Sequence, residues 1–144
     1  MKFQEFIKIT ESINLFKTSK VSQKDFNTII ESFLLFAKKE LNLKKIPKIN
    51  LTKDSNFAKE IGAFGRIKGK DNIMIDVLDR HPMDILRTIA HELVHYQQHE
   101  RNQYGSGHAG SVTEDEANAK AGELIRKFGN SHSQFFKLSL VNEH

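Results

Sequence analysis

The chain has 144 residues and a net charge of +4, with 38% hydrophobic and 28% charged residues, the balance of a single soluble globular domain. It has no Cys, which excludes disulfides and thiolate metal sites, so His, Asp or Glu would have to bind any metal. No apolar run approaches the roughly 20 residues of a membrane span, and residues 1–16 lack the long apolar region of a secretory signal. We therefore expect no secretory signal and a cytoplasmic protein without membrane partners.

Basic residues are concentrated in the first half of the chain, where residues 1–70 hold 15 Lys and Arg against 7 Asp and Glu. A basic half can attract nucleic acid or other acidic partners. The lysines are scattered and no basic stripe is interleaved with aromatic residues, which favours a solvated lysine-rich surface. A basic nucleic-acid-associated protein is one alternative function, which strong salt-dependent DNA binding would support.

Two helical patterns occupy the N-terminal third of the chain. Residues 2–16 show a loosely helical apolar pattern, and we assign residues 1–16 to an N-terminal helical leader and residues 17–144 to a single domain. Ser22 can cap a second helix, which the apolar spacing predicts over residues 23–42. Its apolar positions are Phe26, Ile29, Ile30, Phe33, Leu34, Ala37 and Leu41.

Three apolar segments then indicate a small antiparallel sheet. Residues 46–51 suggest a short strand, and residues 62–69 contain an apolar stretch flanked by glycines. A turn signal at residues 69–72 precedes a third segment at residues 73–78. Alternate positions of that segment are β-branched and apolar, as expected for one buried face: Ile73, Ile75 and Val77.

The next helix begins near Pro82, which suits a first helical position, and its apolar spacing continues to about residue 102. It contains His91-Glu92-Leu93-Val94-His95, an HExxH motif. Because helical residues i and i+4 share one face about 6 Å apart, both histidines can bind one zinc ion at about 2.0–2.1 Å. Glu92 is then placed as the general base toward a water that the metal activates. Unpaired histidines would be costly on a helix with such apolar neighbours.

Two histidines after the motif are candidates for a third ligand. His99 continues the i+4 series, but residues 91 and 99 lie about 12 Å apart on a straight helix, too far for one ion. His108 lies in a glycine-rich loop, where it could be a ligand, an oxyanion donor or a solvent-exposed residue.

Two carboxylates of the following helix are better placed. Thr113 and Glu116 form a capping box that opens this helix, and Gly129 ends it. Glu116 shares a polar face with Lys120, whereas Glu114 lies on the buried face with two alanines. A buried-side carboxylate is what an internal metal requires, so we favour Glu114 as the third ligand. The alanines of that face are Ala117 and Ala121.

A last short helix is expected from about Ser133 to Val141. The predicted fold class is therefore α+β, with a small antiparallel sheet packed on the HExxH helix and helices before and after it.

The pattern His91-Glu92-x-x-His95 followed by Glu114-x-x-Ala117-Asn118 resembles the gluzincin metallopeptidases, in particular the ImmA/IrrE-type and HtpX-type peptidases. The resemblance covers about residues 60–128. It implies a minimal zincin-like domain in which Glu114 is the third zinc ligand and Asn118 orients a ligand histidine. It also implies an antiparallel strand, which residues 62–77 could supply, that pairs with an extended peptide substrate.

Two related metallopeptidase patterns are not matched. The metzincin motif HExxHxxGxxH is absent, and the later third histidine of the SprT-like pattern is missing because position 100 is Glu.

The N-terminus carries a second resemblance. Met1-Lys2-Phe3-Gln4-Glu5-Phe6-Ile7 looks like the capsid-targeting leader on internal proteins of T-even-like tailed phages. Those leaders are cut after an apolar-x-Glu site, and Ile9-Thr10-Glu11 fits that form. The resemblance implies a phage protein packaged in the particle with residues 1–11 removed and a mature start at Ser12; an ordinary amphipathic helix is the alternative.

Taken together, these patterns predict a zinc-dependent metallopeptidase that acts on a peptide or protein substrate. A His₂Glu site suits Zn²⁺ best, although other divalent ions can also bind to it. The oxyanion would need a donor besides the metal, for which Tyr104, His108 and Arg126 are candidates. A catalytically silent zinc-binding structural or partner-binding module is the alternative, and the intact Glu92 argues against it because a structural site needs no base.

Overall fold

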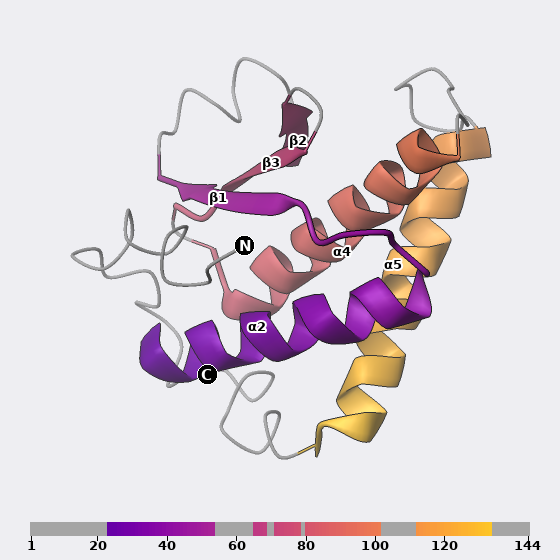
Figure 1. Ribbon diagram of the computed structural model, residues 1–144. Coiled ribbons are helices and arrows are strands. Elements are labelled where there is room, and N and C mark those ends of the chain that lie inside the picture. The colour runs from indigo at the N-terminus through magenta and orange to yellow at the C-terminus, as the bar shows by residue number, and fades with distance from the viewer. Residues whose placement is uncertain (1–22, 54–64, 69–70, 79, 102–111, 134–144) are drawn as a thin grey trace.

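The computed structural model describes residues 23–53, 65–68, 71–78, 80–101 and 112–133 (Figure 1). The class over these ranges is α+β, and the elements keep the labels of Figure 1: α2 (Gln23–Glu40), β1 (Lys48–Thr52), β2 (Gly65–Lys68), β3 (Asn72–Asp76), α4 (Pro82–Glu100) and α5 (Val112–Ser131). The N-terminal leader and nearly all of the expected last helix lie outside the described residues. None of the helices in these ranges is long and apolar enough to cross a membrane.

The described strands form a mixed sheet in the order β1-β3-β2. β2 runs antiparallel to β3, with Gly65 opposite Ile75, but β1 runs parallel to β3, with Leu51 opposite the same Ile75. The expectation of an antiparallel sheet is therefore wrong for the β1–β3 pair. Alternation along a strand indicates which face is buried but not whether the neighbouring strand runs parallel or antiparallel. A parallel pair needs a long connection that carries the chain back to the same end of the sheet, and the chain between β1 and β3 is long enough for it.

The core lies between the inner face of the sheet and the helices, with α4 at its centre. α4 contacts β2 and β3 as well as α2 and α5, so it is covered on both sides (Figure 1). Burying each large apolar side chain contributes about 1.5–3 kcal/mol, so this shared core holds α4 firmly in place. The inner face of the sheet consists of side chains at most 1% exposed: Ile49, Leu51, Ile73 and Ile75.

Helix α2 ends two residues earlier than the apolar spacing predicts, at a left-handed turn. Asn42 has a φ of 54°. The Asn42 N–H donates to the Lys39 carbonyl at 3.2 Å, and the Leu43 N–H donates to the Lys38 carbonyl at 2.9 Å. This pair of bonds is a Schellman motif, in which a residue that tolerates positive φ closes the helix. The chain then turns from α2 toward β1.

The start of α4 agrees with its sequence. Pro82 occupies the first turn, and the His81 side chain caps the helix by accepting a hydrogen bond from the Met83 N–H at 3.0 Å.

Helix α5 begins at Val112, one residue before Thr113, the residue that the predicted capping box places at the cap. The Glu116 carboxylate accepts a hydrogen bond from Gln98 of α4, so it serves the packing of α5 on α4.

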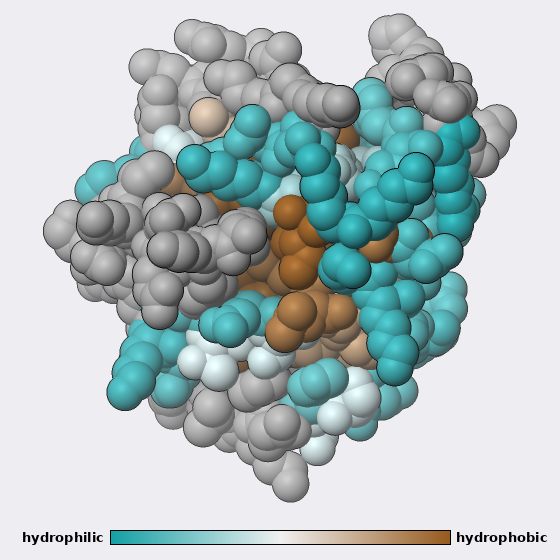
Figure 2. Space-filling view, viewed as in Figure 1, coloured by the Kyte–Doolittle hydropathy of each residue, from teal (hydrophilic) through white to brown (hydrophobic). Residues whose placement is uncertain are grey.

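One hydrophobic patch reaches the surface within the described residues. Figure 2 shows hydrophobic residues between α2 and the segment leading into β1. Leu35 is 59% exposed, and with Leu34, Ile46, Lys38 and Lys44 it lines a hollow. Leu35 is the one large apolar side chain of the described ranges that is exposed.

Candidate metal centre

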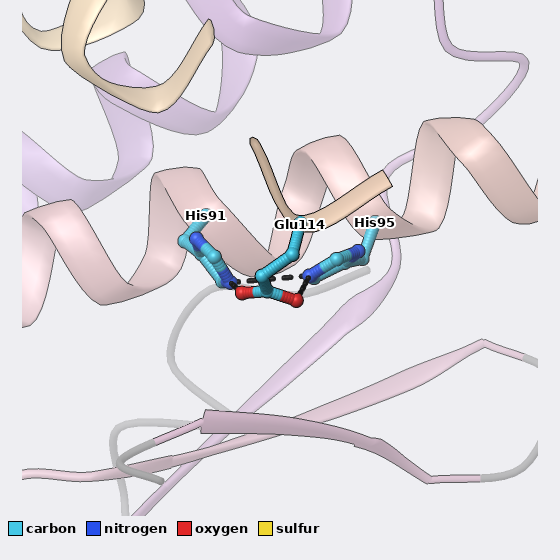
Figure 3. A group of neighbouring side chains, drawn as sticks. All are labelled: His91, His95 and Glu114. Carbon is cyan, nitrogen blue, oxygen red and sulfur yellow. Dashed lines mark hydrogen bonds and ion pairs between the residues drawn. The ribbon is translucent and has the colours of Figure 1, made fainter. Parts of the chain in front are cut away.

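The two histidines of the HExxH motif converge on one point. They lie one turn apart on α4, and their Nε2 atoms are 3.1 Å from each other. On the opposite face of this stretch, Ala90, Leu93 and Val94 are buried in the core. Packing of that face therefore fixes the helix and directs both imidazoles toward the same side (Figure 3).

Glu114, in the first turn of α5, completes the group. Its Oε1 lies 2.8 Å from His91 Nε2, and its Oε2 lies 3.1 Å from His95 Nε2 (Figure 3). Helix α5 presents this carboxylate because Ala117 and Ala121, on the same face, are buried against the rest of the domain. The structure thus brings together the three residues that the sequence predicts as ligands.

The chemistry of these donors fits a divalent metal ion. The three ligand atoms lie within 4.8 Å of one another, and each side chain is partly buried. Neighbouring ligands on a tetrahedral zinc ion lie about 3.3 Å apart. The two Nε2 atoms are 3.1 Å apart, and the carboxylate oxygen nearer to each histidine lies 2.8 Å from His91 Nε2 and 3.1 Å from His95 Nε2. Two imidazole nitrogens and a carboxylate are borderline-to-hard donors of the kind that zinc accepts, and other divalent ions also use them. The group could therefore hold one metal ion.

The state of His91 suits metal binding. Burial lowers the pKa of His91 from its usual value, the neighbouring His95 lowers it further, and contacts with Glu114 and Asn118 act in the opposite direction. Asn118 of α5 hydrogen bonds to His91 through its side chain, which is the place that the gluzincin resemblance gives it. A neutral imidazole is the form that binds a metal, so burial favours ligation.

Glu92 lies beside the three ligands without being one of them. It is 7% exposed, and its Oε2 is 4.0 Å from His91 Nε2. Burial raises the pKa of the Glu92 carboxyl to about 7, a rise that His95 opposes and Glu114 adds to. A carboxyl group with a pKa near neutrality can both accept and return a proton, which is what a general base in hydrolysis does.

Strand β2 approaches α4 at this glutamate. A Cβ atom at Gly65 would lie 2.7 Å from Glu92 Cγ and 2.8 Å from Thr88 Cγ2, closer than side chains can pack. Glycine at this position therefore allows the first residue of β2 to lie directly against the candidate base. This close approach puts an edge of the sheet beside the site.

Gln98 is a residue of the site that sequence reasoning missed. Its Oε1 lies 2.8 Å from His95 Nδ1, and its Nε2 donates to the Thr113 carbonyl at 2.9 Å and to Glu116 Oε1 at 2.8 Å. A signal was present in its spacing, because the third position after His95 shares its side of the helix. Its partners on α5 could not be foreseen from the sequence of α4.

Two further candidates within the described residues, His99 and Arg126, are not part of the ligand group. His99 is exposed and lies on the next turn of α4, and it is not one of the grouped ligands. Arg126 is exposed on α5, 12 positions after Glu114, which is about 18 Å along a helix. Tyr104 and His108 lie outside the described residues.

Comparison of the chain with protein-family models, with curated proteins and with solved structures gave no match.

Proposed function

We propose that the protein is a zinc-dependent metallopeptidase. The observation that carries this proposal is the convergence of His91, His95 and Glu114 beside a buried Glu92. A site that only stabilised the fold would need a fourth ligand and no base, whereas three protein ligands beside a carboxylate suit a hydrolytic site. The HExxH and Glu-x-x-Ala-Asn patterns, which resemble those of the gluzincins, support the same proposal and with it a zincin-like fold.

In the proposed reaction, the ligands, Glu92 and Asn118 have separate roles. When bound by the three ligands, zinc supplies Lewis acidity that polarises the scissile carbonyl and makes water acidic enough to attack at neutral pH. Glu92 takes a proton from the attacking water and delivers it to the nitrogen of the leaving amine as the C–N bond breaks. Asn118 holds His91 in place through its hydrogen bond.

An extended peptide is the substrate form that the sheet favours. β2 pairs with β3 along one edge, and among the described strands none pairs with its other edge. An unpaired edge presents backbone N–H and C=O groups to which an extended peptide can add as a further strand. Since Gly65 of β2 lies against Glu92, a peptide on that edge would have its backbone beside the base.

Metal content tests the ligand set. The wild type should bind one zinc ion per chain by elemental mass spectrometry. Glu114→Ala should lose it because two histidines alone bind weakly, and Glu116→Ala should keep it because Glu116 lies outside the ligand group. A folded wild type that takes up no divalent metal would refute the proposal.

Turnover tests the base. In Glu92→Gln we expect zinc content to be unchanged and hydrolysis of a mixed peptide library to fall by at least about 10²-fold, because the amide cannot take up the proton. Full activity in this variant would overturn the mechanism. Zinc-loaded wild type that cleaves none of the peptides would favour the alternative of a silent zinc-binding module.

A further inference from the structure

Gln98 is buried between α4 and α5, where it contacts one histidine ligand and the residue before the carboxylate ligand. It is 2% exposed, and its side-chain amide lies between the His95 ring and the first turn of α5. The carbonyl of Thr113, which it binds, belongs to the residue directly before the ligand Glu114. One side chain therefore touches a histidine ligand on one helix and the backbone beside the carboxylate ligand on the other.

The partners of Gln98 fix the orientation of its amide. A backbone carbonyl and a carboxylate oxygen both accept hydrogen bonds, so the group that faces Thr113 and Glu116 must be the NH₂. The Oε1 atom then faces His95, and because a carbonyl oxygen only accepts, His95 Nδ1 must carry the proton. The lone pair of that imidazole is left on Nε2, which is the atom that faces His91 and Glu114.

The Glu116 carboxylate that accepts a hydrogen bond from Gln98 also forms an ion pair. The second carboxylate oxygen of Glu116 lies 3.5 Å from the Lys120 ammonium. Glu116, which the sequence placed on a polar face, is thus held between Lys120 and Gln98. Two acceptors on α5 hold the amide, so a rotation that presented NH₂ to His95 would break both of those bonds.

We infer that Gln98 is a positioning residue of the metal centre: it holds His95 with Nε2 as the metal-binding nitrogen and ties that ring to the segment that carries Glu114. The inference rests on the proposed function in assuming that the ligand group binds zinc. Outer partners of this kind typically change metal affinity 10–100-fold when they are removed.

Gln97 provides a matched control. It is the neighbouring residue of the same type, it is 4% exposed, and its Nε2 donates to the Leu41 carbonyl at 2.8 Å. Its Oε1 accepts a hydrogen bond from Lys120 at 3.3 Å, but the ion pair of Lys120 with Glu116 does not need Gln97. Substitution of Gln97 therefore removes comparable buried hydrogen bonds, and its two partners, Leu41 and Lys120, are not ligands.

The test compares Gln98→Met with Gln97→Met, because methionine keeps the length of the side chain without a strong donor or acceptor. Zinc affinity is measured by competition with a chromogenic chelator, and folding by thermal unfolding of both zinc-free proteins. We expect the zinc Kd of Gln98→Met to rise about 10–100-fold while that of Gln97→Met stays at the wild-type value. Similar unfolding midpoints in the two variants would show that lost stability is not the cause.

A second measurement needs no variant and decides the matter if Gln98→Met fails to fold. In the zinc-loaded wild type, the His95 Nδ1 proton should give an NMR signal that exchanges slowly with water, because a buried carbonyl holds it. Rapid exchange of that proton, or equal zinc affinities in the two variants, would overturn the inference and leave the proposed function standing. Zinc binding without peptide hydrolysis would remove the proposed function alone, and a folded wild type that binds no zinc would remove both.

Discussion

Glu92 and Gly65 meet at the boundary between α4 and β2. The Glu92 side chain is buried, and its Cγ lies 2.7 Å from the position that a Cβ atom on residue 65 would occupy. The missing side chain at residue 65 is therefore part of what sets the position of the candidate base. Bases act over distances of about 3 Å, so a shift of about 1 Å at Glu92 can reduce turnover by about 10²-fold.

Gly65→Ala should reduce peptide hydrolysis by about 10–100-fold while leaving zinc content unchanged. The added methyl group would lie 2.7 Å from Glu92 Cγ, so either the glutamate or the strand must move. The atoms nearest to that methyl group belong to Glu92 and Thr88, neither of which is a ligand, so zinc binding should not change. Steady-state kinetics together with elemental mass spectrometry would check both parts. Wild-type turnover in this variant would show that the contact has no bearing on the base.

Gly122→Ala is the matched control for that substitution. A Cβ atom at Gly122 would meet no atom within 4 Å, and the residue lies inside α5. We expect normal hydrolysis and a gain of about 0.5–1 kcal/mol in the free energy of unfolding, because alanine loses less backbone freedom in a helix.

At the scale of the elements, the end of α2 is joined to the helix that carries the histidines. Asn42 turns the chain with its positive φ, and the Leu41 carbonyl beside it accepts the hydrogen bond from Gln97 of α4. α2 also packs on α5 through an edge-on contact of Phe33 and Phe128, whose ring centroids are 5.2 Å apart. The conformation at residue 42 therefore affects the packing of α2 on both helices of the site.

Asn42→Val should lower the free energy of unfolding by about 1–2 kcal/mol, because a β-branched residue is strained in the left-handed region, whereas Asn42→Gly should be neutral or slightly stabilising. Urea denaturation of both variants measures the difference. Equal midpoints for valine and glycine would mean that this turn relaxes at little cost.

At the scale of the molecule, the ligand group joins α4 to α5. His91 and His95 come from one helix and Glu114 from the other, so the site is complete only when the two helices are packed together. A metal ion that binds this arrangement binds the folded chain in preference to the unfolded one. By mass action it must then add to the stability of the whole domain.

Zinc at a free concentration of 1,000 times its Kd should stabilise the domain by about 4 kcal/mol and raise Tm on the order of 10 °C. A chelator should reverse the rise, and in Glu114→Ala zinc should change Tm little. Differential scanning calorimetry with and without zinc measures this. A rise of equal size in Glu114→Ala would place the bound zinc somewhere else.

The ligand group could be predicted from the sequence because its residues follow the spacing of helices. The four-residue spacing of His91 and His95 sets their common face, and the alanines after Glu114 identify the buried side of the second helix. Those alanines are at most 6% exposed, which confirms that this face of the helix is buried.

Strand direction and the role of Gln98 depend on partners that are remote in sequence. The alternation of Ile73 and Ile75 reports a buried face, but the same alternation suits a parallel or an antiparallel neighbour. Gln98 looks like any polar residue of a helix until α5 is packed against it. Periodicity describes one element at a time, and both of these features belong to pairs of elements.

The parallel pairing of β1 also bears on how the sheet assembles. Lys48 and Asn72 pair across 24 positions of the chain, whereas Lys68 and Asn72 pair across 4. Closing the longer loop costs about 1.6 kcal/mol more in chain entropy, so we expect the β2–β3 hairpin to nucleate and β1 to dock afterwards. In stopped-flow kinetics, Ile67→Ala in the hairpin should slow folding, while Leu51→Ala in β1 should mainly speed unfolding. The strand that touches Glu92 would then belong to the folding nucleus.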